Sequence, residues 1–182
     1  LILGSSSKTR QALLKRLKLN FNIMHPDIDE TPLLNEKPIP HVQRLATEKC
    51  QAVRAKADSE AIIITSDQVM DLDGEIMSKP TDKADAISQI MRCSGKSIHF
   101  YTSLLVDSPT LPPALSTVTT IVKYREYDEQ SAITYLDLED TLSAAGSIHC
   151  DGLGISLLES MSSSDPTAIL GLPLITLCTQ LR

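Results

Sequence analysis

Several features that define other protein classes are missing from this sequence. No run of apolar residues approaches about 18 positions, which excludes an ordinary membrane-spanning helix. None of the four cysteines forms a C-x-x-C pair, so the sequence predicts neither a zinc site nor a thioredoxin-like motif. The four histidines show no spacing typical of metal ligands. There is no basic excess either: the formal net charge is -6, which argues against binding to a nucleic acid polymer.

What is present is ordinary for a globular protein. The 182 residues are enough for one domain with a sizeable core, and 42% are hydrophobic. We find no internal repeat, low-complexity tract, linker or secretory signal pattern. The chain opens at Leu1 rather than at methionine, so we expect that a few residues precede it in the native protein. The cysteines are expected to be reduced, packed thiols of a cytoplasmic protein.

The pattern of apolar residues predicts alternating strands and helices, followed by paired strands. Strands are expected over residues 1–4, 21–24, 61–64, 98–106, 115–124 and 154–158. Helices are expected over residues 8–19, 41–57, 81–93 and 129–138, and from Pro173 to the C-terminus. A hairpin should turn at Asp73-Gly74. This order predicts an α/β fold with a mixed sheet.

The first candidate for chemistry is the segment 4–10, Gly-Ser-Ser-Ser-Lys-Thr-Arg, between a strand and a helix. The N-terminus of a helix offers unpaired backbone N–H groups and the positive end of a dipole. Hydroxyl groups and two cations at that place suit an anion such as phosphate. The segment is not a Walker A loop. The alternative is a serine-rich cap, with Ser7 as the capping residue and solvated Lys8 and Arg10.

The second candidate is the acidic cluster Asp27-Ile28-Asp29-Glu30. Clustered carboxylates suit a hard divalent cation, which binds through oxygen. The alternative is a solvated acidic loop.

The third candidate is Asp67, which follows the apolar run 61–64. The carboxyl ends of strands in an open α/β sheet face a crevice, so we expect Asp67 to point into one. Its neighbour Gln68 can both donate and accept hydrogen bonds, which suits the recognition of a base edge. The alternative is a turn aspartate that only ends the strand.

Two lysines complete the set of candidates. Lys49 lies on the apolar stripe of the helix expected over residues 41–57, where an unpaired ammonium group would be costly to bury. A phosphate or one of the carboxylates could be its partner. The alternative is that its stem packs while its head reaches water. Lys79 follows the expected hairpin and could lie over the same crevice.

Together, and in order along nearly the whole chain, these segments resemble the Maf family of nucleoside triphosphate pyrophosphatases. The matching segments are residues 1–7 with Arg10, Asp29-Glu30, Arg44-Leu45-Ala46 with Lys49, Ser66-Asp67, Asp73-Gly74, Lys79-Pro80, Ser94-Gly95, Ala145-Gly146 and 171–174. The ordered set is more specific than any single motif. The resemblance implies one Maf-like domain over residues 1–182, with a central mixed β-sheet flanked by helices and an active-site crevice between two lobes.

Within the family, Ser66-Asp67-Gln68 and Asp165-Pro166-Thr167 resemble the branch that acts on 7-methyl-GTP. In this branch three positions set the choice of base, and they correspond here to Thr9, Gln68 and Asp151. Gln68 agrees with the branch. Thr9 departs from it, because an aromatic residue that could stack on a methylated, cationic base is common there. Asp151 departs less, since glutamate is usual.

The resemblance also implies a mechanism, which is hydrolysis between the α- and β-phosphates to give a nucleoside monophosphate and pyrophosphate. Asp67 would be the general base for water or would hold the metal that activates it. Lys49 and Lys79 would offset negative charge in the transition state. Glu30, with Asp67, would bind a divalent cation, magnesium or manganese. The residues implied in substrate binding are Ser5, Ser7, Thr9, Arg10, Gln68 and Asp151.

Alternatives to this function stay open. The chain could be a dTTP and UTP pyrophosphatase of the sister branch, which usually has threonine after the central aspartate. It could also be a non-catalytic nucleotide-binding regulator of cell division, or an interaction protein with a vestigial crevice. The family resemblance further implies a homodimer, whereas neither a nucleic acid polymer nor a membrane is expected as a partner.

Overall fold

The computed structural model describes residues 1–139, 141, 144–150 and 152–182. Its strands are β1 (Ile2–Gly4), β2 (Asn22–Met24), β3 (Ile63–Leu72), β4 (Glu75–Met77), β5 (Ser97–Asp107), β6 (Ala114–Tyr124) and β7 (Leu158–Ser163). Its α-helices are α1 (Lys8–Lys15), α2 (Pro38–Arg54), α3 (Lys83–Cys93), α4 (Glu129–Leu138) and α5 (Leu174–Gln180). Three short 3-10 helices are η1 (Ala145–Ser147), η2 (Leu153–Leu157) and η3 (Ala168–Leu170).

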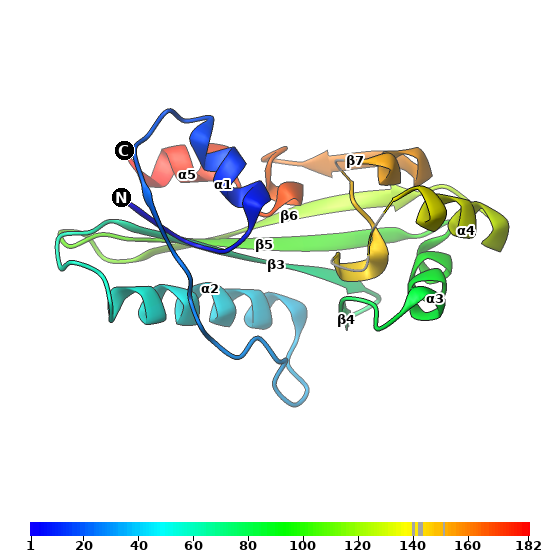
Figure 1. Ribbon diagram of the computed structural model, residues 1–182, viewed down its shortest axis with the longest axis horizontal. Helices are drawn as coiled ribbons and strands as arrows, with labels where there is room; N and C mark the ends of the chain where they lie inside the picture. Colours follow the sequence, from blue (N-terminus) through cyan, green and yellow to red (C-terminus); the bar gives the residue numbers. More distant parts are fainter. Residues whose placement is uncertain (140, 142–143, 151) are drawn as a thin grey trace.

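The seven strands form one mixed sheet, as the alternation of elements predicted. The strand order is β2-β1-β3-β5-β6-β7, and β4 pairs with β3 beside this path. Strand β1 pairs in parallel with β2 and β3, whereas β3, β5, β6 and β7 pair antiparallel. The three long strands β3, β5 and β6 run through most of the molecule, so they connect its two halves (Figure 1).

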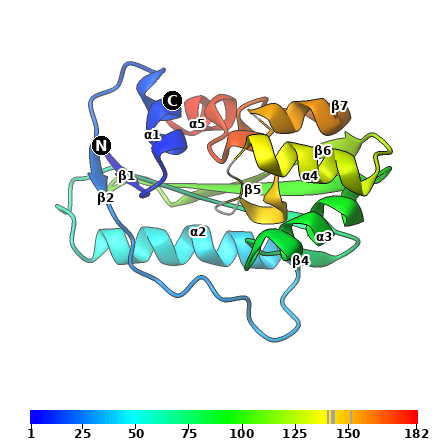
Figure 2. The ribbon, with the colours of Figure 1, turned by 45° about the vertical axis from the view of Figure 1, so that its right-hand side comes forward.

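In the half that holds both chain ends, helices cover both faces of the sheet (Figures 1 and 2). Helix α2 covers one face, where its buried side chains pack on those of β1, β3 and β5: Ala46, Cys50 and Val53 against Ile2, Ile63 and Leu105. Helices α1 and α5 cover the other face, with Leu13, Leu14, Leu174 and Leu177 against Leu3, Ile64 and Leu104. This half is therefore a three-layer sandwich.

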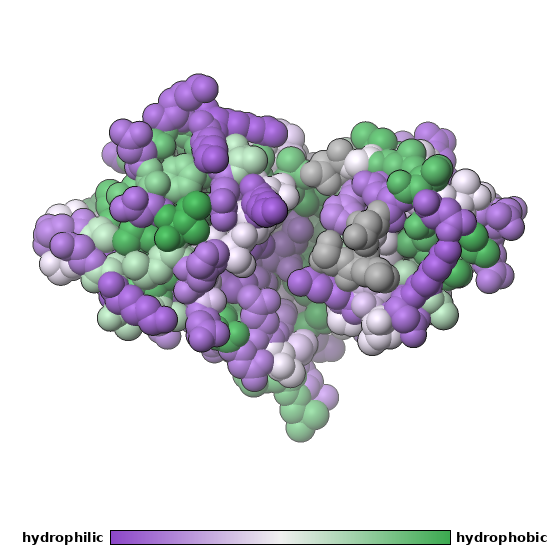
Figure 3. All heavy atoms as spheres, in the orientation of Figure 1, coloured by the Kyte–Doolittle hydropathy of each residue, from purple (hydrophilic) through white to green (hydrophobic). Residues whose placement is uncertain are grey.

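The other half has a separate core beneath α3 and α4. Side chains of these helices pack on the far ends of the long strands, and the members include Ile90, Cys93, Ala132, Tyr135, Met70, Phe100 and Val122. The surface is hollowed between the two halves (Figure 3). The two lobes and the crevice between them agree with the expected α/β architecture.

Several predicted helix boundaries were wrong, among them the end of the helix expected over 8–19 and both ends of the helix expected over 41–57. Helix α1 ends at Lys15 rather than near residue 19, because Lys18 adopts a left-handed backbone (φ 58°) as the chain turns toward β2. Helix α2 begins at Pro38 rather than at residue 41, since prolines are tolerated in the first turn, where backbone N–H groups have no helical partner.

Within the described residues, no helix is both long enough and apolar enough to cross a membrane.

Two predicted strands were also wrong. Residues 153–157 form η2, and the strand that follows is β7. Strand β7 lies at the edge of the sheet, so it needs no continuous apolar run to mark it in the sequence. The strand expected over 61–64 continues to Leu72, which places Asp67 within β3 and not beyond its end. Buried polar side chains are accommodated there by distant partners, as when the Thr65 hydroxyl donates to the Ala46 carbonyl (2.7 Å).

One edge of β3 is interrupted. Along its other edge β3 pairs with β5 from Ile63 to Asp71. On the interrupted edge it pairs with β1 only as far as Ile64 and with β4 only from Met70 onward. Among the described residues, no strand therefore lies beside the segment 65–69 on that edge. Because successive side chains of a strand point to opposite faces, a ligand at this gap can reach side chains from both faces of the sheet.

We expect the core beneath α1 and α5 to contribute strongly to the stability of the domain. Replacing the fully buried Leu104 by alanine should lower the free energy of unfolding by about 2–5 kcal/mol, through lost burial and the cavity left behind. Leu115 on the neighbouring strand is 41% exposed, so Leu115→Ala should cost less than about 1 kcal/mol. Urea denaturation followed by circular dichroism measures both, and equal losses would contradict this assignment of the core.

Candidate functional site

The turn between β1 and α1 presents two serine hydroxyl groups at the crevice. Ser7 caps the helix, because its Oγ accepts the backbone N–H of Arg10 (3.3 Å). The Oγ of Ser5 accepts the N–H of Ser7 (3.2 Å). Each hydroxyl uses its oxygen as an acceptor, so its own hydrogen is free to be donated to an anion. The capping role and the anion-binding role therefore coexist here.

Arg10, in the first turn of α1, is anchored to the turn that follows η3. Its Nε donates to the carbonyl of Gly171 (2.8 Å), and the Ser66 hydroxyl lies 2.8 Å from the same oxygen. Burial lowers the pKa of Arg10, while the negative charges of Asp67 and Glu30 raise it. An arginine stays charged under such opposing effects, so a fixed cation lies beside the two carboxylates.

Lys49 joins the two predicted carboxylates. Its Nζ lies 2.5 Å from Asp67 Oδ1 and 2.7 Å from Glu30 Oε1. Lys49 and Asp67 are only 5% and 6% exposed, which excludes the arrangement in which the lysine head reaches water. Lys49 therefore has the carboxylate partner that its place on an apolar stripe required.

Within the acidic segment 27–30, only Glu30 reaches this cluster. Burial raises the pKa of Glu30, but the hydrogen bond and charge of Lys49 and the charges of Arg10 and Lys79 outweigh it, so the pKa lies below its usual 4.5. Glu30 is thus ionised at neutral pH. Asp27 and Asp29 are exposed, and Asp29 accepts the backbone N–H of Thr31 (2.9 Å), as in a solvated loop.

The loop that carries Glu30 is tied to α2 by an arginine fork. Arg44 donates from Nε and Nη2 to the two carboxylate oxygens of Glu36, each at 2.7 Å. Its Nη2 also donates to the Thr31 carbonyl (3.1 Å), one residue after Glu30. The hydrogen bonds from Arg44 hold the pKa of Glu36 well below its usual range. Two parallel charged hydrogen bonds fix the orientation of Arg44, which in turn holds the backbone next to Glu30.

These groups surround a charged cavity of about 320 Å³. It is lined by Gly4, Ser5, Ser6, Ser7, Arg10, Pro26, Glu30, Lys49, Asp67, Gln68 and Lys79. Lys79 is exposed and forms no hydrogen bond or ion pair with any described residue. Three cations face two carboxylates, which leaves one positive charge in excess within an acidic protein. Such a cavity suits a polyanion.

Gln68 separates the charged cavity from a second one. Its Nε2 donates to the carbonyls of Ala168 (2.8 Å) and Ile169 (3.0 Å). Carbonyl oxygens can only accept, so the orientation of the amide is determined. Its Oε1 has no partner among the described residues and remains available as an acceptor.

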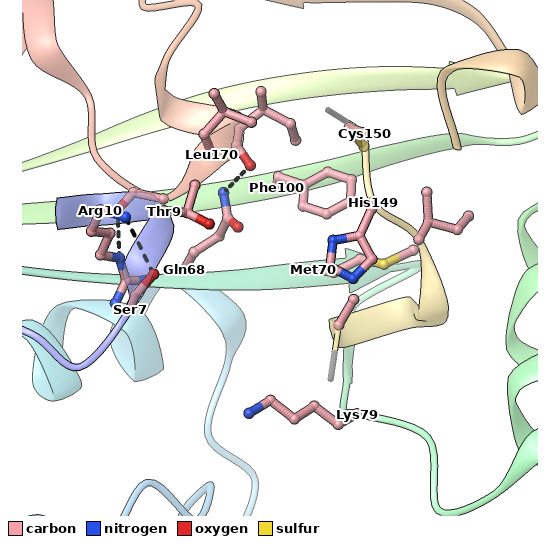
Figure 4. A pocket seen from close by; sticks show the side chains of 14 residues that line it. Ser7, Thr9, Arg10, Gln68, Met70, Lys79, Phe100, His149, Cys150 and Leu170 are labelled. Atoms are coloured by element: carbon pink, nitrogen blue, oxygen red, sulfur yellow. Dashed lines mark hydrogen bonds between the residues drawn. The ribbon is translucent and has the colours of Figure 1, made fainter. Parts of the chain in front are cut away.

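The second, mixed cavity has a volume of about 300 Å³ (Figure 4). It shares Ser7, Arg10, Gln68 and Lys79 with the charged cavity. Its remaining lining is largely apolar: Thr9, Met70, Phe100, Ala144, Ile148, His149, Cys150, Ile169, Leu170 and Gly171. A flat ring with polar edges fits such a lining.

The structure brings nearly all predicted site residues together. Ser5, Ser7, Arg10, Glu30, Lys49, Asp67, Gln68 and Lys79 line the charged cavity. Thr9 lines the mixed cavity only. Asp151 lies outside the described residues. Sequence reasoning missed Phe100, His149, Ile169 and Leu170, because they come from distant elements and carry no local motif.

Glu30 and Asp67 could hold a divalent cation whose remaining coordination positions are filled by a bound substrate and water. Among the described residues, no group of three or more histidine, cysteine, aspartate or glutamate side chains could hold a metal. Magnesium, however, commonly binds one or two carboxylates together with phosphate oxygens and water. Glu30 and Asp67 both contact Lys49 Nζ, so their carboxylates face the same point of the cavity and are the residues that could provide such a pair.

Removing Lys49 should destabilise the protein, because the buried Asp67 carboxylate would lose its partner. We expect Lys49→Met to lower the free energy of unfolding by about 3 kcal/mol. Glu30 is the matched control: its side chain is 59% exposed, so Glu30→Gln should cost less than about 1 kcal/mol. Chemical denaturation measures both. A Lys49→Met protein as stable as the wild type would show that the pair is not needed for folding.

Comparison with known proteins points to one family. Residues 1–182 match the model of a family described as Maf-like protein. A 7-methyl-GTP pyrophosphatase of Aromatoleum aromaticum is 44% identical over 183 residues, which cover 100% of this chain and 94% of that protein. A 7-methyl-GTP pyrophosphatase of Burkholderia orbicola is 42% identical over 185 residues, covering 100% of this chain and 88% of its own. With a family model that spans the whole chain and relatives that match it from end to end, this chain belongs to the Maf family.

Proposed function

We propose that this protein hydrolyses nucleoside triphosphates between the α- and β-phosphates, releasing a nucleoside monophosphate and pyrophosphate. The observation that carries the proposal is the pairing of a charged cavity with a mixed cavity through shared walls. A triphosphate in the first would place its base in the second. Several relatives are named pyrophosphatases, which supports the same class of reaction.

In this mechanism Asp67 takes a proton from the attacking water as it adds to phosphorus, or it holds the metal that activates that water. Lys49 fixes the Asp67 carboxylate through their 2.5 Å contact. Arg10, Lys79 and the hydroxyls of Ser5 and Ser7 bind the phosphate chain. Their positive charge and hydrogen bonds offset the charge that develops on the departing pyrophosphate.

Glu30 and Asp67 are the residues that would hold a magnesium or manganese ion. A divalent cation bound there would polarise a phosphate oxygen and neutralise part of the charge of the triphosphate. Lys49 holds the Glu30 carboxylate at the cavity through their 2.7 Å contact, and Arg44 binds the backbone carbonyl of the next residue, Thr31.

The preferred substrate in this proposal is 7-methyl-GTP, so the protein would act as a house-cleaning enzyme for modified nucleotides. Relatives that match the whole chain carry that name. The unpaired Oε1 of Gln68 suits the N–H donors of a guanine edge. Thr9 offers no aromatic surface, but Phe100 lines the same cavity and supplies one. The proposal extends to a homodimer, as the family resemblance implies, and to the cytoplasm, as expected for a protein with reduced thiols.

A nucleotide panel tests the proposal directly. With magnesium or manganese, we expect pyrophosphate release from 7-methyl-GTP to exceed that from GTP, dTTP, UTP and CTP, and a chelator to abolish it. A coupled assay for pyrophosphate provides the measurement. Release from none of them by well-folded protein would overturn the enzymatic proposal. Faster release from dTTP or UTP would favour the sister branch instead.

A single substitution separates an enzyme from a nucleotide-binding regulator. Asp67→Asn keeps the size of the side chain but removes its basicity, so kcat should fall by about 100-fold to 10,000-fold while nucleotide binding persists. Asp137→Asn is the control, since Asp137 is exposed and remote from both cavities. Binding without turnover by the wild type would support the regulator, and so would an Asp67→Asn protein that retains its ligand-linked function.

A further inference from the structure

One polar side chain of the mixed cavity has no role in the mechanism above. His149 follows η1, and its backbone N–H donates to the Tyr135 hydroxyl (3.0 Å), which fixes the chain at this point. Figure 4 shows the ring of His149 reaching into the cavity beside Met70, across from Gln68. The ring therefore forms the wall opposite the free amide oxygen of Gln68.

The two ring nitrogens of His149 differ in their surroundings. Nε2 is buried and has no hydrogen-bond partner among the described residues. Nδ1, the nitrogen next to the attachment point of the ring, lies on the side that faces the cavity (Figure 4). A neutral imidazole carries its hydrogen on one nitrogen only. Burying an N–H without an acceptor costs more than leaving it at an open cavity, so the hydrogen belongs on Nδ1.

The mixed cavity thus presents an acceptor on one wall and a donor on the other. Gln68 Oε1 is the acceptor and His149 Nδ1–H is the donor. A 6-oxo purine that bears a 2-amino group matches this pair, because its 2-amino group donates and its 6-oxo group accepts at opposite ends of one edge. Methylation at N7 leaves both of these groups unchanged. An adenine would place its 6-amino donor against the donor of His149.

We propose that His149 is a specificity-determining residue that donates a hydrogen bond to the 6-oxo group of a guanine-type base. This inference rests on the proposed function for the position of the base. His149 would recognise the purine base, and it is distinct from the residues that bind the phosphates. It also gives a reason for selection against adenine, since a buried donor facing another donor stays unpaired.

The test compares two variants of His149 with 6-oxo and 6-amino substrates. His149→Phe keeps a ring but removes both nitrogens, whereas His149→Asn keeps an N–H donor near the place of Nδ1. We expect His149→Phe to lower the kcat/KM ratio of GTP to ATP about tenfold, as for one lost hydrogen bond, mainly through KM. The 7-methyl-GTP to ATP ratio should fall equally, and His149→Asn should retain most of both preferences. Thermal unfolding of each variant verifies the fold.

Binding provides a second readout that does not depend on turnover. Calorimetric titration with GMP and AMP should show preference for GMP in the wild type and its loss in His149→Phe. If this holds while no nucleotide is hydrolysed, the proposed function fails and the role of His149 stands. An unchanged ratio in His149→Phe, or an equal loss for both bases, would overturn the inference and leave His149 as a packing residue. Absence of any GMP binding would overturn it as well.

Discussion

The site depends on the interruption in the edge of β3. Strand β1 stops pairing at Ile64 and β4 starts at Met70, while β5 supports the opposite edge throughout. The pleat directs Asp67 toward α2 and Gln68 toward η3, as their partners Lys49 and Ala168 show. In a continuous sheet these two side chains would be separated by backbone. The gap lets one nucleotide contact both side chains. The proposed catalytic residue, Asp67, and the residue proposed to contact the base, Gln68, can therefore be neighbours in sequence.

Electrostatics explains how an acidic chain can receive a polyanion. The formal charge of -6 is spread over the whole chain, whereas the charged cavity collects Arg10, Lys49 and Lys79 around two carboxylates. Arg10 and Lys49 are held by protein partners, so they require little reorganisation when a phosphate arrives. Lys79 is free in the described structure and can move to the ligand. Arg10 and Lys49 thus provide fixed positive charges, and Lys79 provides one that can move to the phosphates.

Sequence reasoning succeeded where local chemistry determines structure and failed where distant contacts do. The Ser7 cap and the Asp73-Gly74 turn follow from local preferences, and the structure has both. The central position of Asp67 in β3 was missed because the apolar run ends at Ile64, and buried Thr65 is satisfied only by distant Ala46. His149 was dismissed for lack of metal-ligand spacing, a criterion that cannot reveal a nitrogen aimed into a cavity formed by other elements.

The β5–β6 hairpin has a mechanical consequence for the crevice. Its register runs unbroken from the Ser97–Lys123 pair to the Val106–Ala114 pair, through both lobes. Opening the lobes like a hinge would bend this ladder and strain its hydrogen bonds. The width of the crevice is therefore preset by the sheet, and little conformational entropy is lost there on binding. Adjustment to a ligand falls to side chains outside the sheet, such as Lys79, which is exposed and forms no hydrogen bond or ion pair with any described residue.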